Sequence, residues 1–534
     1  MVSMPKVWKV AERIKEDLID QLLSNRGINT PEEKEKFYNP KVSDYQKLVE
    51  IPNISIAMKR IKKAIEDQEL IVVYGDYDVD GITASTIMYR GLTSLGAKII
   101  PYIPHREKEG YGMSQIGLDN VRALGANLVI TVDNGIVAID QAQYVKELGM
   151  DLIITDHHLT NADGRLPEAL TIVHSTEMCG AAVAWCLLQK ELSDKMSDEL
   201  LQFAAIAEVA DMIPLTGLGR AFVTEGLKVI NKTQNPGLLA LFREAKLEQG
   251  KITARDFGHA IGPRLNAIGR LEHAIDAVRL LCTENEKRAR DLARLLQETN
   301  DKRKDFTTIA VDEALVTIKK NGDKKIHIVH SETFLPGVIG LIAARICQET
   351  SKPAIAISVG EKISKGSARS IDGVNIAETI RACSDILVDV GGHKGAAGFS
   401  ITKENIPLFI ERMEKLLIDL PEDVEQILEI DAEVEKKELK KSLVRQLQKF
   451  EPCGHQNPQP LFVGRGFQIS DMRTLSEGKH LKFKADGIDA IAFGKGEMLN
   501  VLEQGMFIDI AFYLELNIFR GQENLQLMVK DIRV

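Results

Sequence analysis

Short apolar runs alternate with helix-like stretches between residues 70 and 155. The β-favouring runs lie at 70–74, 98–103, 127–132 and 151–155, and the helix-like stretches between them lie at 83–95, 114–123 and 137–148. Strands that alternate with helices at this spacing predict an α/β fold with a doubly wound parallel sheet. Sheets of this kind bind ligands beyond the carboxyl ends of their strands. We therefore expect the functional site at that edge.

Acidic and imidazole side chains follow three of these runs. They are Asp76, Asp78 and Asp80 after the first, Asp133 at the end of the third, and Asp156, His157 and His158 at the end of the fourth. A further carboxylate, Asp211, ends an apolar helix predicted at 200–210. The carboxyl ends of parallel strands meet at one edge, so we expect these groups to lie together, with Gly81 letting the chain turn into the next helix.

This set of side chains has the chemistry of a dinuclear metal site. Carboxylates with one or two imidazoles favour manganese or magnesium over a metal that prefers thiolates. Two such ions roughly 3.5–4 Å apart can activate a water molecule and stabilise both oxygens of an in-line displacement at phosphorus. The residues alone therefore predict a phosphoesterase with two divalent cations.

Three other interpretations fit these residues less well. The stretch DYDVDG matches the start of a calcium-binding loop, but that loop needs Glu at its twelfth position, where this chain has Ile87, and a helix before it, where a strand is predicted. An Asp after a strand commonly caps the next helix, which explains one aspartate better than the whole set. His157 and His158 taken singly are typical polar loop residues, but beside Asp156 at a ligand edge they favour metal binding.

The rest of the chain follows other patterns. Residues 193–316 are mostly helix-favouring and include a long charged stretch at 287–314. A strand at 324–330, a helix at 338–349 and a strand at 353–359 predict a second α/β unit. From residue 427 onwards, short strands separated by turns predict a small antiparallel β domain, a sandwich or a barrel.

Bulk properties limit the classes of protein that remain. A net charge of −9 argues against a general nucleic-acid coat, although it permits a local basic groove. The six cysteines form no CxxC pair, so neither a zinc site nor a disulfide framework is predicted. No apolar run reaches the roughly 18 residues that a membrane span needs, and the charged N-terminus lacks the apolar stretch of a signal peptide. We expect a cytoplasmic protein that does not bind a membrane.

Several motifs together carry a family resemblance. YGDYDVDG, VDNG, TDHH and ADMIPL occur in the order of the four motifs of the DHH phosphoesterase superfamily, which they resemble. More closely, the chain resembles the RecJ family, the branch of exonucleases specific for single-stranded DNA, through GPRLNAIGR (262–270), PGVIGLIAARI (336–346), KGSARS (365–370), GGHKGAAGF (391–399) and EPCGHQNPQPLF (451–462). The resemblance implies an N-terminal arm (1–45), a DHH catalytic domain (46–215), a helical segment with a long linker helix (216–318), a DHH-associated domain (319–422) and an OB-fold (427–534).

The same resemblance implies roles for the acidic cluster. Direct ligands of two divalent cations, Mn²⁺ or Mg²⁺, would be Asp78, Asp80, Asp133, His157 and Asp211. Asp76 and His158 would be close partners that either ligate a metal or orient a ligand, and the sequence leaves both alternatives open. Asp156 is a candidate for orienting an imidazole, since a metal-bound histidine usually donates its second ring nitrogen to a carboxylate.

The implied reaction is stepwise 5′→3′ hydrolysis of single-stranded DNA to mononucleotides in repair and recombination. Phosphate-binding candidates are Arg264, Asn266 and Arg270 near the metals, and Arg345, Ser367, Arg369, His393 and Lys394 in the second lobe. Tyr77, Tyr111 and Tyr74 lie near the metal motifs and could either stack bases or belong to the core. Single-stranded-DNA-binding protein and a helicase are the implied partners of a protein we expect to be a monomer.

Two departures from the family pattern affect this expectation. Family members commonly carry Trp-His before the PGVIG segment, where this chain has Phe334 and Leu335, and the stretch after the DHH motif looks shortened. Neither change touches an expected metal ligand. Two alternatives stay open: a DHH phosphodiesterase acting on short oligonucleotides or dinucleotides, and a non-catalytic scaffold that binds single-stranded DNA.

Overall fold

The computed structural model describes residues 6–161, 163–322, 324–420, 426–519 and 521–534. The first five residues of the expected arm and residues 421 and 422 of the expected DHH-associated domain lie outside that description. The chain divides into two compact units. The first unit holds the described residues up to Pro263, with Ile275–Arg290 and Ile427–Val534, and the second holds Arg264–Ala274 and Asp291–Gln426.

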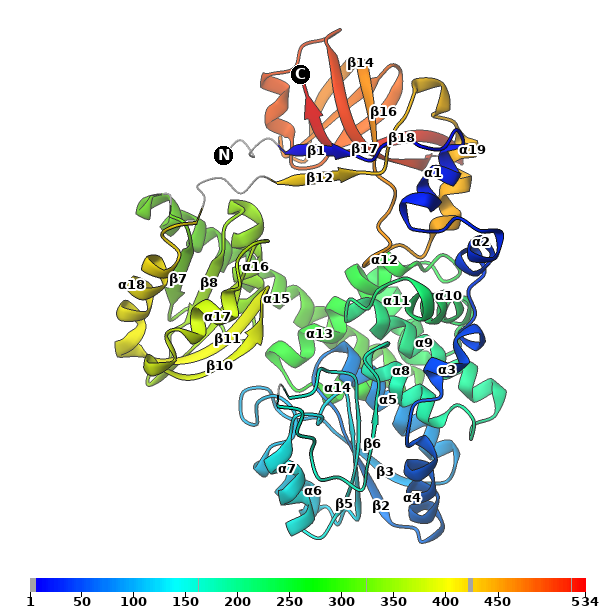
Figure 1. Ribbon diagram of the computed structural model, residues 1–534, viewed down its shortest axis with the longest axis vertical. Coiled ribbons are helices and arrows are strands. Elements are labelled where there is room, and N and C mark those ends of the chain that lie inside the picture. The colour runs from blue at the N-terminus through cyan, green and yellow to red at the C-terminus, as the bar shows by residue number, and fades with distance from the viewer. Residues whose placement is uncertain (1–5, 162, 323, 421–425, 520) are drawn as a thin grey trace. The chain divides into compact units, whose positions relative to one another are not determined.

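The predicted parallel sheet is confirmed in the first unit. Its strands are β2 (Leu70–Tyr74), β3 (Lys98–Tyr102), β4 (Leu128–Val132), β5 (Asp151–Asp156) and β6 (Thr171–His174). They lie in the order β3-β2-β4-β5-β6, and each neighbouring pair runs parallel. Figure 1 labels β2, β3, β5 and β6 among the helices of the first unit. The sequence missed β6, which is short and only half-buried at alternate residues. The carboxyl ends of β2, β4 and β5 therefore meet at one edge.

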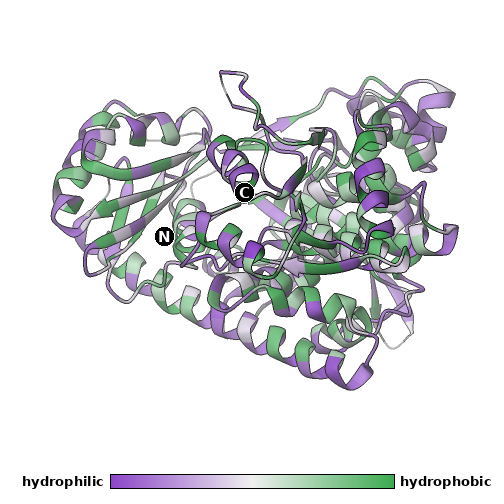
Figure 2. Cartoon of the chain, turned by 90° about the horizontal axis from the view of Figure 1, so that it is seen from below, coloured by the Kyte–Doolittle hydropathy of each residue, from purple (hydrophilic) through white to green (hydrophobic). Residues whose placement is uncertain are grey.

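Helices cover both faces of this sheet, as a doubly wound fold requires. Those nearest the sheet are α4 (Ile54–Glu66), α5 (Val79–Ser94), α6 (Gln115–Ala123), α7 (Ile139–Glu147) and α8 (Gly180–Leu188). Leu118 of α6 and Val145 of α7 share one buried cluster with Val72, Val129 and Ile154 of the strands. Helices α5 and α8 contact the strands from the other side. Colouring by hydropathy shows hydrophobic and hydrophilic residues alternating along the helices (Figure 2).

Helix α5 begins at Val79, earlier than the expected residue 83. It starts there because the Asp78 side chain accepts a hydrogen bond from the backbone N–H of Gly81 (3.1 Å) and caps the helix. Gly81 therefore lies inside the helix, and the prediction that it makes the turn was wrong. A Cβ atom at Gly81 would lie only 2.5 Å from the backbone nitrogen of Asp76, so glycine is needed there for close approach.

The remaining elements of the first unit are helical or belong to a β-barrel domain. The other helices are α1 (Leu18–Asn25), α2 (Pro31–Tyr38), α3 (Gln46–Val49), α9 (Asp194–Ala210), α10 (Gly217–Ile230), α11 (Pro236–Ala245), α12 (Ala254–Asp256), α14 (Ile275–Cys282) and α19 (Lys441–Leu447). The strands after residue 426 are β12 (Ile427–Ile430), β13 (Ala432–Glu433), β14 (Phe462–Leu475), β15 (His480–Ala485), β16 (Ile488–Ala492), β17 (Phe507–Phe519) and β18 (Gln522–Arg533).

This C-terminal domain is a closed barrel, one of the forms expected from the sequence. Its strand order is β13-β14-β15-β16-β18-β17, and the additional pairing of β14 with β17 closes it. The expectation of an antiparallel domain was only partly right, because β16 pairs with β18, and β13 with β14, in parallel. A parallel pairing needs a connection that crosses the barrel, which short local strand signals do not reveal.

The N-terminal arm contributes to the same barrel domain. Strand β1 (Val7–Val10) pairs in parallel with β12. Leu22 and Leu23 of α1 and Phe37 of α2 belong to one buried cluster with Phe462 and Phe512 of the barrel. Residues at the two ends of the chain therefore share one core.

The second compact unit contains the second α/β unit that the sequence predicts. Its strands are β7 (His327–Ser331), β8 (Ala354–Ser358), β9 (Ile363–Arg369), β10 (Leu387–His393) and β11 (Ala396–Thr402), in the order β10-β11-β9-β8-β7. Its helices are α16 (Ile339–Thr350), α17 (Ile376–Arg381) and α18 (Ile406–Leu416). The chain passes between the units within α13 (Gly262–Leu271) and within the 36-residue helix α15 (Glu286–Asn321). Among the described residues, no helix is both long and apolar enough to cross a bilayer.

Candidate metal centre and substrate-binding residues

All seven predicted catalytic residues meet at the carboxyl edge of the β2–β6 sheet. Their ligand atoms form three overlapping groups, each with its members within 4.8 Å of one another. The groups are Asp76, Asp78 and Asp133; Asp80, His157 and Asp211; and Asp133, His157 and His158. Asp133 and His157 each belong to two groups, so the groups form one continuous cluster.

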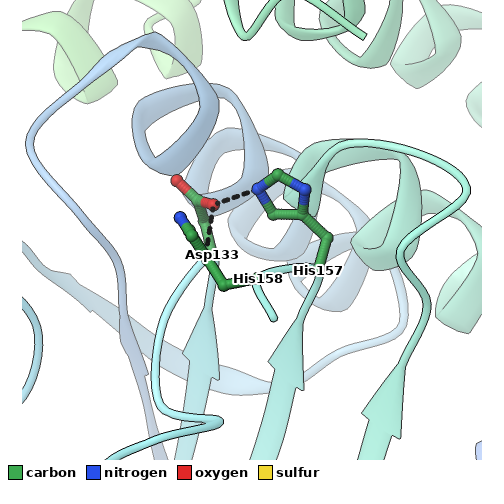
Figure 3. A group of neighbouring side chains, drawn as sticks. All are labelled: Asp133, His157 and His158. Carbon is green, nitrogen blue, oxygen red and sulfur yellow. Dashed lines mark ion pairs between the residues drawn. The ribbon is translucent and has the colours of Figure 1, made fainter. Parts of the chain in front are cut away.

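Asp133 lies at the centre of this cluster, directly after β4. Its Oδ1 is 3.2 Å from Nε2 of His157 and 3.9 Å from Nδ1 of His158, both of which follow β5 (Figure 3). Asp133 has a φ of 60°, in the left-handed region that a residue other than glycine rarely adopts. Backbone strain of this kind persists where the surrounding structure enforces it, and it concentrates at functional sites.

His157 faces three carboxylates. Besides Asp133, its Nε2 lies 3.5 Å from Oδ2 of Asp80 and 3.5 Å from Oδ2 of Asp211. Burial lowers the pKa of His157 below its ordinary value, against the opposing effect of Asp80. Imidazole ligates a metal ion through an unprotonated ring nitrogen, and the lowered pKa of His157 favours that form.

Asp76 and Asp78 join the cluster from the β2–α5 connection. Asp76 is 2% exposed, and burial together with the charge of Asp78 raises its pKa well above the ordinary value. Burial also raises the pKa of Asp133 well above the ordinary value, with Asp80 and Asp78 adding to the rise. Burial and the same two carboxylates raise the pKa of Asp211 to about 8. Without a cation, these acids oppose one another's ionisation.

The cluster fits divalent cations on an independent observation. Asp76 Oδ1 is a buried atom with no hydrogen-bond partner among the described residues, and buried Asp133 Oδ1 and His157 Nε2, although 3.2 Å apart, likewise make no hydrogen bond of good geometry there. Leaving a buried polar atom unpaired costs about 1–3 kcal/mol, so such atoms usually have a partner. Carboxylate oxygens with one imidazole form the donor set of a hard or borderline divalent ion. These atoms would therefore hold manganese or magnesium.

Asp80 is held by the amino end of helix α8. Its Oδ2 accepts the backbone N–H of Gly180 (2.6 Å) and its Oδ1 accepts that of Ala181 (2.7 Å). A Cβ atom at Gly180 would lie 2.7 Å from Cβ of Asp133, so only glycine lets this helix approach the cluster so closely. Sequence reasoning missed this contact, because the two segments lie far apart in the chain and α8 looks like an ordinary apolar helix.

Asp156 orients His158. Its Oδ1 accepts hydrogen bonds from the backbone N–H of His157 (2.7 Å) and of His158 (3.1 Å), and it pairs with Nδ1 of His158 (2.8 Å). Its Oδ2 accepts the N–H of Ile136 (2.8 Å). Burial lowers the pKa of His158, but the hydrogen bond with Asp156 and the charges of Asp156, Asp211 and Asp80 together outweigh it and raise this pKa to about 9. Asp156 was expected to orient an imidazole, and the imidazole that it contacts is that of His158.

Aromatic side chains lie beside the cluster. The rings of Tyr77 and Tyr111 meet edge to face with their centroids 6.4 Å apart, and Tyr111 Oη lies 3.3 Å from Nε2 of His158. Tyr111 is 52% exposed, whereas Tyr74 is fully buried in the sheet core. The possibility that Tyr74 stacks a base was therefore wrong, since β2 directs its ring into the core. Arg106, which the sequence analysis did not single out, lies over the ring of Tyr77 at 4.8 Å.

The phosphate-binding candidates of α13 lie in the second unit. Arg264 is 9% exposed, and its Nε donates to Oε1 of Gln297 on α15 (2.7 Å). Arg270 donates from Nη1 to the carbonyl oxygen of Gly337 (3.1 Å). Asn266 lies between them on the same helix. The two arginines are thus held by contacts within this unit.

The other candidates of this unit lie on the β7–β11 sheet, at its β10–β11 turn or on helix α16. Arg369 donates from Nη1 to Oγ of Ser367 (3.2 Å), and both side chains face Gly340 in the first turn of α16. Burial lowers the pKa of Arg369. His393 and Lys394 lie at the β10–β11 turn, where Ala396 pairs with both His393 and Arg369 in the sheet register. Arg345 instead pairs with Glu349 on α16 (2.9 Å).

Comparison with families of known proteins identifies three regions of this chain. Residues 70–208 match the model of the DHH family, N-terminal domain. Residues 322–419 match the DHHA1 domain, and residues 430–531 match the RecJ OB domain. The three models follow one another in the order of the predicted domains.

Individual proteins resemble nearly the whole chain. The single-stranded-DNA-specific exonuclease RecJ of Bacillus subtilis is 34% identical over 97% of this chain and 68% of its own length. The protein of that name from Salmonella typhimurium is 30% identical over 96% of this chain and 95% of its own length. The crystal structure of Thermus thermophilus RecJ in complex with Mn²⁺ has a TM-score of 0.85 at 27% identity, covering 99% of this chain and 79% of that one. A second crystal structure of that protein, in complex with Mg²⁺, has a TM-score of 0.78 at 26% identity over 99% of this chain and 78% of that one.

Proposed function

Because the chain belongs to the RecJ family of DHH phosphoesterases, we propose that it is a two-metal exonuclease that degrades single-stranded DNA 5′→3′ to mononucleotides in DNA repair and recombination. The observation that carries this proposal is that five carboxylates and two imidazoles from four parts of the fold form one cluster around His157 and Asp133. Hydrolysis of a phosphodiester needs charge compensation at the phosphate and a deprotonated attacking water.

The residues of the cluster would hold two divalent cations, Mn²⁺ or Mg²⁺. When bound, such a pair activates a water molecule and stabilises the attacking and leaving oxygens of an in-line displacement. Asp78, Asp80, Asp133, His157 and Asp211 are the proposed direct ligands, with Asp76 as a further ligand through its unpaired Oδ1. His158 is held as a hydrogen-bond donor by Asp156, so its proposed role is to donate to the substrate phosphate or to the leaving oxygen.

Neighbouring side chains would hold the strand. Tyr111 and Tyr77 offer exposed or half-exposed ring faces for stacking of bases, which is independent of sequence. Arg106, over the ring of Tyr77, is placed to meet a phosphate. The proposed phosphate-binding set of the second unit is Arg264, Asn266, Arg270, Arg345, Ser367, Arg369, His393 and Lys394. Arg345 is the weakest member, because Glu349 neutralises it.

The setting of the enzyme is also proposed from the family. We propose that the N-terminal arm, DHH domain, linker, DHH-associated domain and OB-fold act together as a monomer in the cytoplasm. A helicase that opens the duplex and single-stranded-DNA-binding protein would supply its substrate. The OB-fold would add affinity for long strands through phosphate contacts that carry no sequence information.

The decisive experiment digests single strands and duplexes labelled at the 5′ or the 3′ end, with Mn²⁺ or Mg²⁺. We expect labelled mononucleotides to appear first from 5′-labelled single strands and little digestion of blunt duplexes. Asp133→Asn keeps the size of the side chain but removes a charge, and it should abolish the digestion. Asp140→Asn, at an exposed position in the first turn of α7, is the matched control and should digest as the wild type does.

The outcomes separate the alternatives. Release from the 3′ end first would refute the polarity. Digestion confined to dinucleotides would indicate a phosphodiesterase for short oligonucleotides, and binding of single strands without digestion would indicate a scaffold.

A further inference from the structure

One buried acid near the metal centre has no part in the set of ligands. Glu208 lies in the last turn of α9, three residues before Asp211, and is 0% exposed. An acid is almost never fully buried unless other groups satisfy it, because burial disfavours its charged form. Burial raises the pKa of Glu208 to about 8, against the opposing hydrogen bond from Cys179. Because burying this acid costs free energy, we expect Glu208 to have a specific role.

The two carboxyl oxygens of Glu208 have different surroundings. Oε1 accepts the backbone N–H of Cys179 at 3.3 Å. Oε2 is buried and has no hydrogen-bond partner among the described residues. It faces Gly219 in the first turn of α10, where a Cβ atom would lie 2.5 Å from the carbonyl oxygen of Pro214 and 3.2 Å from Oε2 of Glu208. Glycine at that position therefore leaves room for both oxygens.

The contact with Cys179 leads directly to a metal ligand. Cys179 is the capping residue directly before α8, and the next two N–H groups, of Gly180 and Ala181, bind the two oxygens of Asp80. Helix α9, which carries Glu208, is followed directly by Asp211, another member of the cluster. One carboxyl group thus connects the helix end that holds Asp80 with the helix end that carries Asp211.

We propose that Glu208 is a positioning residue, which fixes the distance between Asp80 and Asp211 by anchoring the amino end of α8 to the carboxyl end of α9. The proposal rests on the proposed two-metal function. Asp80, His157 and Asp211 form one ligand group, in which Nε2 of His157 is 3.5 Å from each of the two carboxylates. A shift of α8 moves Asp80 relative to this nitrogen. Groups that orient ligands commonly change metal affinity or activity about 10–100-fold when they are lost.

The test compares three substitutions of Glu208 with one control. Glu208→Leu removes the acceptor at similar volume, Glu208→Asp keeps the carboxyl group but withdraws it from Cys179, and Glu208→Gln keeps an acceptor without an ionisable group. Gln202→Leu is the matched control, because Gln202 is also 0% exposed on α9 and its amide donates to the carbonyl oxygen of Glu199, within its own helix. Each variant is checked for folding by circular dichroism and thermal unfolding.

Binding of Mn²⁺ is measured directly, by electron paramagnetic resonance of the free ion in the absence of DNA. We expect Glu208→Leu and Glu208→Asp to weaken Mn²⁺ binding about 10-fold to 100-fold. Glu208→Gln should stay within about threefold of the wild type, and Gln202→Leu should leave Mn²⁺ binding unchanged. The concentration of Mn²⁺ that gives half-maximal digestion should shift in parallel, while KM for single-stranded DNA changes little at saturating Mn²⁺.

Several results would overturn this role. Wild-type Mn²⁺ binding in folded Glu208→Leu refutes it, and if that variant does not fold, wild-type binding in Glu208→Asp refutes it. An equal loss in Gln202→Leu would show that the effect belongs to packing of α9 in general. Because ion binding is read without DNA, failure of the positioning role is distinguishable from failure of the exonuclease assignment.

Discussion

Arg220 joins three segments of the first unit, and its removal gives a quantitative test of how they are held together. This arginine of α10 is 2% exposed, and its guanidinium group lies 3.9 Å from the ring of Phe37. It donates hydrogen bonds to the carbonyl oxygens of Phe37 (2.8 Å), Lys449 (3.4 Å), Phe450 (3.1 Å), Glu451 (2.7 Å) and Pro452 (3.0 Å). Burial lowers its pKa to about 10, so it remains a cation at neutral pH.

The expected effect of Arg220→Met depends on which carbonyl oxygens have no other side chain that donates a hydrogen bond to them. Phe450 and Pro452 keep the amide of Asn457, at 3.0 and 2.9 Å, and the bonds to the other two loop carbonyls are only part-buried, where water can enter. The carbonyl oxygen of Phe37 loses a buried donor, which costs about 1–3 kcal/mol. The lost cation–π contact adds about 1 kcal/mol. The ring of Phe37 packs edge to face on that of Phe450 in the 449–457 loop, with the centroids 5.5 Å apart. We therefore expect Arg220→Met to weaken the joint attachment of Phe37 and this loop to α10 by about 2–4 kcal/mol.

Native-state hydrogen exchange of the peptide spanning residues 448–458 measures this free energy. The amides of Gly454 and Asn457 each bond to the other's carbonyl oxygen within this loop. At about 1.4 kcal/mol per tenfold, a loss of 2–4 kcal/mol accelerates their exchange roughly 30-fold to 700-fold. Arg243→Met, at an exposed position of α11, is the control and should leave exchange of this loop unchanged.

A second substitution sharpens the test. In a double variant with Asn457→Val, Phe450 and Pro452 lose both donors, so the combined effect should exceed the sum of the two single effects. Additive effects, or acceleration below threefold in Arg220→Met, would refute the reasoning that Arg220 holds this loop.

Three further predictions concern the barrel core, the metal centre and the substrate. Leu22→Ala should destabilise the C-terminal barrel domain by about 2–5 kcal/mol in urea unfolding, because fully buried Leu22 belongs to its core; an unchanged midpoint would contradict this. In metal-free protein, the melting temperature should fall as pH rises from 6.5 to 8. The folded protein keeps Asp211 protonated up to its raised pKa of about 8, whereas the unfolded chain releases this proton at lower pH, so ionisation of Asp211 destabilises the fold. Saturating Mn²⁺ should remove the fall, and a flat profile in chelator would contradict the prediction. Tyr111→Ala should raise KM for single strands roughly 5-fold to 150-fold, the equivalent of about 1–3 kcal/mol of stacking, whereas Tyr111→Phe should not; equal effects would place the role in the hydroxyl group.

Much of the metal centre could be predicted because its signals are local. Each apolar run of the sheet spans a few residues, and β2, β4 and β5 begin and end within one residue of the expected positions. Parallel strands bring their carboxyl ends to one edge whatever the details of packing. Asp76, Asp133 and His157 could therefore be assigned to one site before any distance was known.

Residues that act across long separations could not be predicted in this way. The amides of Gly180 and Ala181 bind Asp80, and Glu208 binds Cys179, through helix ends that look like ordinary apolar helices in the sequence. Tyr74 and Tyr77 are equally aromatic, and only the direction of β2 sends the first into the core.

The sequence by itself determined the order of secondary structures in the catalytic sheet and the chemistry gathered at its edge, because periodicity and strand ends are properties of neighbouring residues. Tertiary structure alone decided which distant segments share a core. Strand β1 pairs with β12, and Leu22 packs with the C-terminal barrel, because apolar surfaces from both ends of the chain are buried together there. Tertiary structure likewise decided that the two helix ends meet at Asp80 and Glu208, since such contacts depend on how whole helices dock and not on any local pattern.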